Sequence, residues 1–174
     1  HTPTRRQRQM CIRDRFNHVY DRKGVREITS GGGKNALFPH HRGIYLGWSK
    51  TGFKGKTYDT WHVKNGVHQK FEKLVSKNVG PVYADYTALI SWKTGADGEV
   101  MLEEERTIKA FHPTNKGYGV LEVDTVLKAK NGDVRLDGDP EHAGCQFRAS
   151  NLTAEIAKRV KQGKAPKFQG TKYI

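Results

Sequence analysis

The sequence lacks the features that define several large classes of protein. It has only two cysteines, Cys11 and Cys145, which excludes a disulfide scaffold. No apolar run approaches the roughly 20 residues that a bilayer-crossing helix needs, so we expect no membrane span. The motifs GxSxG, GxxxxGK[ST] and HExxH are also absent, and nothing therefore supports a serine hydrolase of the nucleophile-elbow type, a P-loop or a zincin.

Basic charge is abundant, but most of its excess lies at the two ends. The formal net charge is +13. Residues 1–15 hold five arginines against one acid, and residues 158–174 hold six basic residues and no acid. Residues 16–157 carry 20 basic and 17 acidic residues. Because nucleic-acid binding requires clustered phosphate contacts, this nearly neutral body makes no strong case for a nucleic-acid partner.

The same distribution divides the chain into three segments. Residues 1–15 have no apolar periodicity, and their QRQMCIRDR stretch resembles translated sequencing-adapter sequence, so we expect a non-native or disordered basic segment. Residues 16–150 are expected to form one β-sandwich domain. Residues 151–174 are expected to hold a short helix, capped by Asn151 and ended by Gly163, and then a basic tail.

The body shows the periodicity of β-strands. From Val82 to Trp92, one set of alternate residues is apolar or aromatic, which predicts a strand with one buried face. A turn at 94–98 leads into a second strand over 99–111, as in an antiparallel hairpin. A Gly- and Lys-rich loop is expected at 49–57. Further strands are expected at 42–48, 66–79, 118–130, 134–136 and 143–149. Such spacing predicts an all-β, antiparallel sandwich.

The run from Asp137 to Arg148 is the most informative polar segment. On a regular strand, one face would hold the core residues Ala143, Cys145 and Phe147. The other face would present His142, Gln146 and Arg148, with Gly144 leaving room for a ligand beside the backbone. Imidazole, amide and guanidinium groups on one face can bind hydroxyls or a carboxylate. The alternative is a solvated outer face, which more often consists of Lys, Glu and Thr.

Carboxylates and further histidines supply other candidates. Glu104 shares a strand face with Arg106 and several apolar residues, which predicts a buried, ion-paired acid, although a solvated ladder also explains the neighbouring glutamates. Either this cluster or the acids at 122 and 124 could serve sugar chemistry. The spacing of His40, His41 and His62 matches no recognised metal-ligand pattern, so no metal ligand is assigned.

Several motifs, in one collinear order over about residues 16–150, resemble the soluble bacterial PmoA-like family. They include LFPHHRGIYLGW at 37–48, DTWH at 59–62, EEER at 103–106 and VRLDGDPEHAG at 134–144. Members of that family are commonly labelled methane oxygenase PmoA, although the family is better described as a domain of unknown function. Because no spanning segment is present here, the resemblance does not imply the membrane-bound methane monooxygenase.

The resemblance instead implies a β-sandwich, or the larger supersandwich, in bacteria that degrade polysaccharides. Family members are longer at both ends, so this chain is expected to be a metagenomic fragment of a larger domain, with open sheet edges prone to aggregation. A periplasmic or secreted location is compatible with the resemblance. It assigns no catalytic residue, cofactor or oligomeric state.

The leading hypothesis is a carbohydrate-binding or carbohydrate-modifying protein with a sugar or glycoside ligand. The candidate catalytic residues for proton transfer are His41, His142 and Glu104. The candidate sugar-binding residues are Arg42, Trp48, Trp61, His62, Gln146 and Arg148. One alternative is a metal-dependent oxygenase that uses His40, His41, His62 or His142, and another is a noncatalytic interaction domain with a basic tail.

Overall fold

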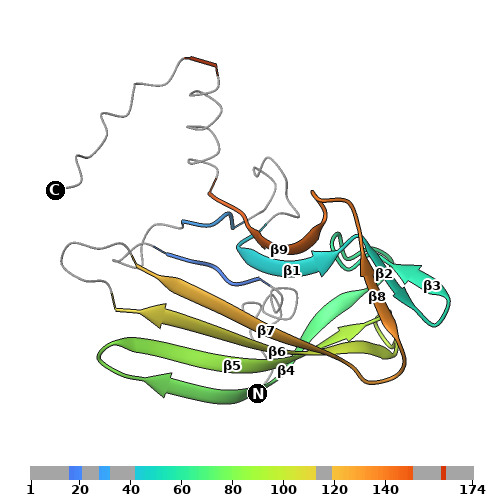
Figure 1. Cartoon of the computed structure of the whole chain (residues 1–174), viewed down its shortest axis with the longest axis horizontal. Coiled ribbons are helices and arrows are strands. Elements are labelled where there is room, and N and C mark those ends of the chain that lie inside the picture. Colours follow the sequence, from blue (N-terminus) through green and yellow to red (C-terminus); the bar gives the residue numbers. More distant parts are fainter. Residues whose placement is uncertain (1–15, 21–27, 32–41, 113–118, 151–161, 164–174) are drawn as a thin grey trace, which may run out of the picture. The chain divides into compact units, whose positions relative to one another are not determined.

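A computed structural model describes residues 16–20, 28–31, 42–112, 119–150 and 162–163 (Figure 1). The chain forms two compact units, one comprising His1–Asn17 with Tyr45–Gln146 and the other His18–Ile44 with Phe147–Ile174. The regular elements of the described ranges are the strands β1 (Ile44–Trp48), β2 (Lys50–Phe53), β3 (Lys56–Tyr58), β4 (His68–Val79), β5 (Tyr83–Lys93), β6 (Val100–Phe111), β7 (Leu121–Ala129), β8 (Val134–Asp137) and β9 (Ala143–Phe147). The helix expected after residue 150 lies outside the described residues.

The largest sheet of the first unit is antiparallel, with strand order β4-β5-β6-β7 (Figure 1). The expected hairpin around 94–98 is confirmed, since β5 and β6 pair along their whole length. Ala88, Ile90 and Trp92 are buried, and Ile90 lies opposite Glu104 in the register. The alternation therefore predicted the buried face of this sheet correctly over residues 88–92, whereas Val82 at the start of the pattern is exposed.

Smaller sheets form a second layer in the same unit. β2 pairs with both β3 and β8, and β1 pairs with β9. The prediction of a loop at 49–57 is wrong, because β2 and β3 form a hairpin there. Lys54 and Gly55 adopt φ angles of 47° and 73°, and two successive positive φ values are what a tight type I′ hairpin turn requires.

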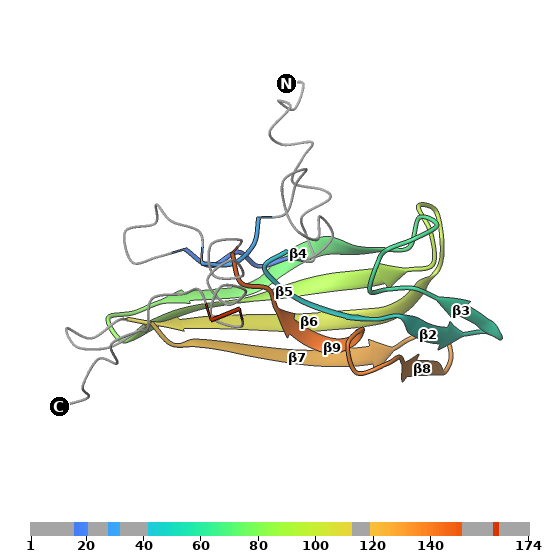
Figure 2. The same ribbon diagram turned by 90° about the horizontal axis from the view of Figure 1, so that it is seen from above.

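The hydrophobic core lies between these two layers. Leu46 of β1 and Phe53 of β2 pack with the sheet residues Ala88, Ile90, Trp92, Met101 and Leu102. In Figures 1 and 2, β2, β8 and β9 lie over one face of the β4–β7 sheet. Two antiparallel layers around one core confirm the all-β sandwich.

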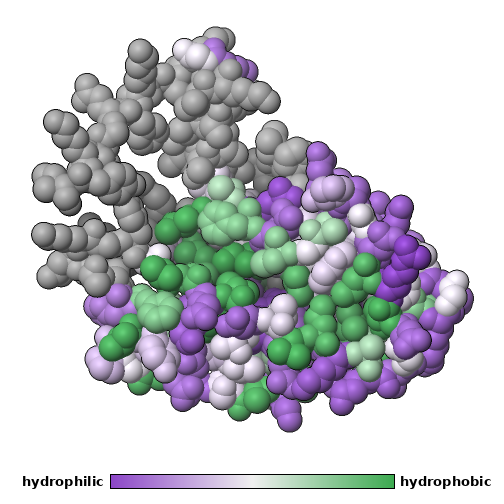
Figure 3. Space-filling view, in the orientation of Figure 1, coloured by the Kyte–Doolittle hydropathy of each residue, from purple (hydrophilic) through white to green (hydrophobic). Residues whose placement is uncertain are grey.

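The β4–β7 sheet extends beyond this core. β4 is exposed from Lys70 to Val79, and apolar residues such as Leu74 and Val82 are also exposed. Figure 3 shows apolar side chains between charged ones where this sheet reaches the surface. The opposite end, where β4 begins and β5 ends, carries the candidate site.

Candidate functional site

The loop after β3 holds an aspartate and a histidine in direct contact. Asp59 Oδ2 lies 2.8 Å from Nδ1 of His62. The other carboxylate oxygen, Oδ1, accepts hydrogen bonds from the amides of Trp61 and His62 at 3.1 and 2.8 Å. Aspartate forms such turns readily because its short side chain reaches amides two and three residues further along. One carboxylate thus fixes both the loop backbone and the imidazole.

The turn between β8 and β9 repeats this arrangement. Asp139 Oδ1 lies 2.7 Å from Nδ1 of His142 and also accepts the amide of Glu141 at 3.0 Å. The hydrogen bond with His142 lowers the pKa of the Asp139 carboxyl. Since a carboxylate only accepts hydrogen bonds, both contacts require a proton on Nδ1. Nε2 is then the nitrogen of each ring that can take up a further proton.

The two imidazoles face each other, and we refer to His62 and His142 as the histidine pair. Their ring centroids are 5.3 Å apart and their planes are inclined by 35°. Their side chains are 25% and 33% exposed, so solvent reaches both residues. The rings of Trp61 and His142 meet edge to face, with centroids 5.6 Å apart. The centroid of the Trp61 ring also lies 5.0 Å from that of Tyr45. Buried aromatic rings therefore support one side of the pair.

Both turns are attached to the same end of β1. The amides of Thr60 and Trp61 donate to the carbonyl of Trp48 at 3.0 and 3.1 Å, and the amide of Ser49 donates to the carbonyl of His142 at 2.9 Å. The Thr60 hydroxyl also accepts the Trp48 amide at 3.0 Å. The backbones of Trp48 and Ser49 thus hold both histidine-bearing turns at the end of β1.

Gly47 permits the close approach of this loop to β1. A Cβ at this position would lie 2.7 Å from the carbonyl oxygen of Thr60, which is shorter than any ordinary contact. Only glycine leaves the space that the backbone of residues 60 and 61 occupies here. The position of the Asp59 loop therefore requires a residue without a side chain at position 47.

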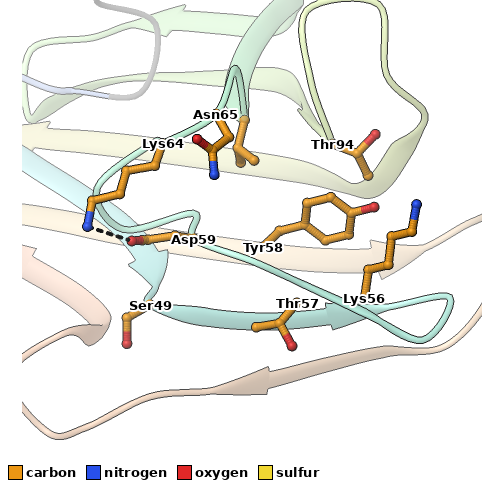
Figure 4. A pocket seen from close by; sticks show the side chains of 9 residues that line it. Ser49, Lys56, Thr57, Tyr58, Asp59, Lys64, Asn65 and Thr94 are labelled. Carbon is orange, nitrogen blue, oxygen red and sulfur yellow. Dashed lines mark ion pairs between the residues drawn. The ribbon is translucent and has the colours of Figure 1, made fainter.

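A pocket of about 560 Å³ opens beside Asp59 (Figure 4). We call it the Asp59 pocket, and its lining residues are Ser49, Lys56, Thr57, Tyr58, Asp59, Lys64, Asn65, Val67 and Thr94. Figure 4 shows the Tyr58 ring in the middle, with Lys56 to one side and Asn65 and Lys64 to the other. Hydroxyl, amide and ammonium groups around an aromatic ring suit a small polar ligand.

The backbone of this loop is strained. Val63 and Asn65 have φ angles of 57° and 55°, in the left-handed region. Asparagine adopts this region readily, whereas it costs a residue such as valine about 1–3 kcal/mol. Val63 is β-branched, which makes this conformation especially unusual. Its amide donates to the carbonyl of Asp59 at 3.1 Å. Such strain is common where a backbone is held in place for binding.

Glu104 belongs to the core and not to this site. It is fully buried, and its two oxygens accept four hydrogen bonds of 2.7–2.9 Å, two from Arg106 and one each from Trp92 and Thr125. The buried ion pair predicted from the strand pattern is confirmed. The predicted catalytic role of Glu104 is corrected, because a buried carboxylate with both oxygens occupied cannot reach a substrate.

The tryptophans differ from their predicted role as sugar platforms. The side chain of Trp61 is fully buried, so its face is closed to a ligand and it supports His142 instead. Trp48 is half-buried and packs on Trp92 with ring centroids 5.8 Å apart. Of the predicted sugar-contacting residues within the described ranges, His62 and Trp61 both lie against the predicted catalytic residue His142, and His62 is the one of these two whose side chain solvent reaches.

The assignment of faces along 142–148 is wrong. Gly144 has a φ of 87°, a left-handed conformation that glycine adopts readily. Beyond it the residues still alternate, but Cys145 and Phe147 are exposed instead of buried, while Gln146 and Arg148 are half-buried. The predicted polar row therefore does not form an outer face of the strand.

The remaining predicted residues lie elsewhere in the chain. Arg42 and Arg148 belong to the second unit, in which the amide of Arg148 donates to the carbonyl of Gly43 at 2.9 Å. His40 and His41 lie outside the described residues. Within the described ranges, no three His, Cys, Asp or Glu side chains are grouped to hold a metal ion, and no helix is long and apolar enough to cross a membrane.

Sequence reasoning missed the partners of the histidine pair and the Asp59 pocket. The positioning role of Asp139 and the lining residues Ser49, Tyr58 and Asn65 were not identified. One signal was available, because the spacing Asp-x-x-His occurs at 59–62 and again at 139–142. The pocket left no comparable signal, since its residues come from four separate segments.

Comparison with known proteins gives one finding. No curated protein and no solved structure matches the chain. A family model matches residues 12–170, which includes every described strand. The match also begins inside the basic segment 1–15 and covers most of 151–174. The chain therefore belongs to a family of unknown function, DUF6807.

Proposed function

We propose that this protein binds and chemically modifies a carbohydrate, with the histidine pair as its proton-transfer centre. The observation that carries the proposal is the pairing of two imidazoles, each held at Nδ1 by a carboxylate. One of these carboxylates, Asp59, also lines a pocket of hydroxyl and amide groups. The resemblance of the sequence to the PmoA-like family, with its implied role in bacterial sugar metabolism, supports the choice of ligand.

His142 is the proposed general acid or base. Asp139 holds its Nδ1–H at 2.7 Å, which orients the ring and stabilises the imidazolium that forms when Nε2 takes up a proton. Asp59 does the same for His62 at 2.8 Å. Two facing imidazoles allow one ring to accept a proton from a sugar while the other donates one. Asp59 and Asp139 act as positioning residues.

The test is proton transfer to sugars in deuterated water, followed by NMR. The full chain is incubated with a panel of neutral and acidic saccharides. We expect solvent deuterium to replace a carbon-bound hydrogen of the saccharide on which the protein acts, because hydroxyl protons exchange without a catalyst. His142→Ala should slow this exchange at carbon by about 100-fold or more, the usual contribution of a general acid or base. The control His112→Ala removes a histidine of another part of the sheet and should change nothing.

The pH dependence separates a catalytic role from a structural one. Asp139→Asn should reduce exchange and alter its pH profile, because the imidazolium loses its carboxylate. Equal exchange in wild type and His142→Ala would contradict the proposal. Saccharide binding without any exchange would favour the noncatalytic alternative.

The contact of His62 with His142 also favours a second candidate, a metal-dependent oxygenase. Imidazoles whose Nδ1 is held by a carboxylate are common metal ligands. Elemental analysis after reconstitution with iron, copper or zinc tests this candidate. A stoichiometric metal that is lost in His142→Ala would support it, whereas less than stoichiometric metal would contradict it.

A further inference from the structure

We infer that the Asp59 pocket binds an acidic saccharide, meaning a sugar residue that carries a carboxylate. The inference rests on the proposed carbohydrate function and names the class of sugar. It is carried by the charge of the pocket, by the chemistry of its neutral lining and by the strained loop that forms one of its walls.

The pocket has more positive than negative charge available to a ligand. Its one carboxylate, Asp59, is already engaged by the His62 ring and by two backbone amides. Lys64 lies 3.8 Å from that carboxylate and is 65% exposed, so it can turn toward a ligand at little cost. Lys56 has no acidic partner among the residues that the structure describes. An anionic group would therefore meet two available ammonium groups.

The neutral lining suits the rest of a sugar ring. Its lining includes the hydroxyl residues Ser49, Thr57 and Thr94 and the amide residue Asn65. These groups both donate and accept hydrogen bonds, as sugar hydroxyls do. The Tyr58 ring in the middle of the pocket (Figure 4) supplies an apolar surface for the C–H face of a sugar. A simple inorganic anion would leave this surface unused.

The left-handed backbone at Val63 and Asn65 helps to place the ligand groups. These residues flank Lys64, so the turn fixes the backbone positions from which the side chains of Lys64 and Asn65 reach the pocket. A loop fixed in advance loses less conformational entropy when it binds. The same loop carries His62, and the pocket shares with it the carboxylate of Asp59, which lines the pocket and holds the His62 ring.

The test measures binding to the full chain by calorimetry. The probes are oligosaccharides of glucuronate and galacturonate, the matching neutral oligosaccharides of glucose and galactose, and inorganic sulfate. We expect the uronates to bind at least about tenfold more tightly than the neutral sugars. Each of Lys56→Ala and Lys64→Ala should weaken uronate binding by about two- to fivefold, the range for exposed charge pairs. The affinity for neutral sugars should not change in either variant.

Two further variants make the result specific. Asn65→Ala should weaken the binding of neutral and acidic sugars alike, because it removes hydrogen bonds to sugar hydroxyls. Lys73→Ala removes an exposed lysine of β4 that lies outside the pocket and serves as the matched control for lost charge. All four substituted residues are exposed, so the variants are expected to fold, and NMR spectra of each variant check this.

The outcomes separate this inference from the proposed function. Uronate binding that is unchanged in Lys56→Ala and Lys64→Ala would overturn the pocket assignment and leave the carbohydrate function standing. Equal affinity for neutral and acidic sugars, or for sulfate and uronates, would also overturn it. If no saccharide binds, both the inference and the proposed function fail.

Discussion

At the residue scale, Glu104 and Arg106 show how a buried charge can be read from alternation alone. Both residues sit on the core-facing side of β6, at positions that the period-two pattern assigns to the interior. A buried carboxylate must be paired and fully hydrogen-bonded. Its exact partners, Trp92 and Thr125, come from the two neighbouring strands and depend on a register that the sequence does not reveal.

The first prediction concerns this buried pair. Glu104→Ala should lower the free energy of unfolding by about 3–5 kcal/mol, because it leaves the Arg106 guanidinium buried without its carboxylate. Urea denaturation measures the change. The control Glu105→Ala removes an exposed acid of the same strand that contacts Lys128 and should have little effect. Equal losses in both variants would contradict the structural role of Glu104.

The second prediction concerns the pKa of Asp139 and its hydrogen bond with His142. Because the hydrogen bond from His142 lowers the pKa of Asp139, the folded carboxyl titrates below its unfolded value. The contact therefore stabilises the fold above the unfolded pKa and loses this effect as pH falls through the folded pKa. His142→Ala should raise the Asp139 pKa, as measured by carboxyl NMR titration. An unchanged titration would show that the contact is not formed in solution.

At the scale of elements, strand existence was predictable and strand connections were less so. The alternation over 82–92 and the turn at 94–98 predicted β5 and the start of β6 correctly. The Lys- and Gly-rich segment 49–57 looked like a loop because its composition is typical of loops, but positive φ at Lys54 and Gly55 turns it into a hairpin. Along β9 the alternation was present, but its exposed face carries Cys145 and Phe147, which the residue types alone assigned to the core.

The third prediction concerns the attachment of the Asp59 loop to β1. Gly47→Ala should destabilise the protein by about 1–3 kcal/mol, as overpacking usually does, because its Cβ would meet the Thr60 carbonyl. It should also shift the NMR signals of His62 and His142. The control Gly52→Ala, in β2, places a Cβ 3.4 Å from its nearest neighbour, the Cβ of Arg135 in β8, and should be tolerated. Undisturbed histidine signals in Gly47→Ala would contradict the proposed attachment.

At the scale of the whole molecule, charge gave little guidance to the site. Most of the excess behind the net charge of +13 lies in the terminal segments, whereas the candidate site rests on a few side chains of the nearly neutral body. The local Asp-x-x-His spacing was visible in the sequence. The meeting of its two copies was not, because it depends on backbone hydrogen bonds from both turns to the Trp48–Ser49 end of β1.

The most direct measurement of the central claim is long-range nitrogen–proton NMR of the histidine rings, with and without saccharide. We predict that the neutral rings of His62 and His142 carry their proton on Nδ1, and that a bound saccharide shifts the Nε2 signal of His142. Protons on Nε2, or a His142 signal that no saccharide of the panel changes, would contradict a carboxylate-positioned histidine pair acting on a sugar.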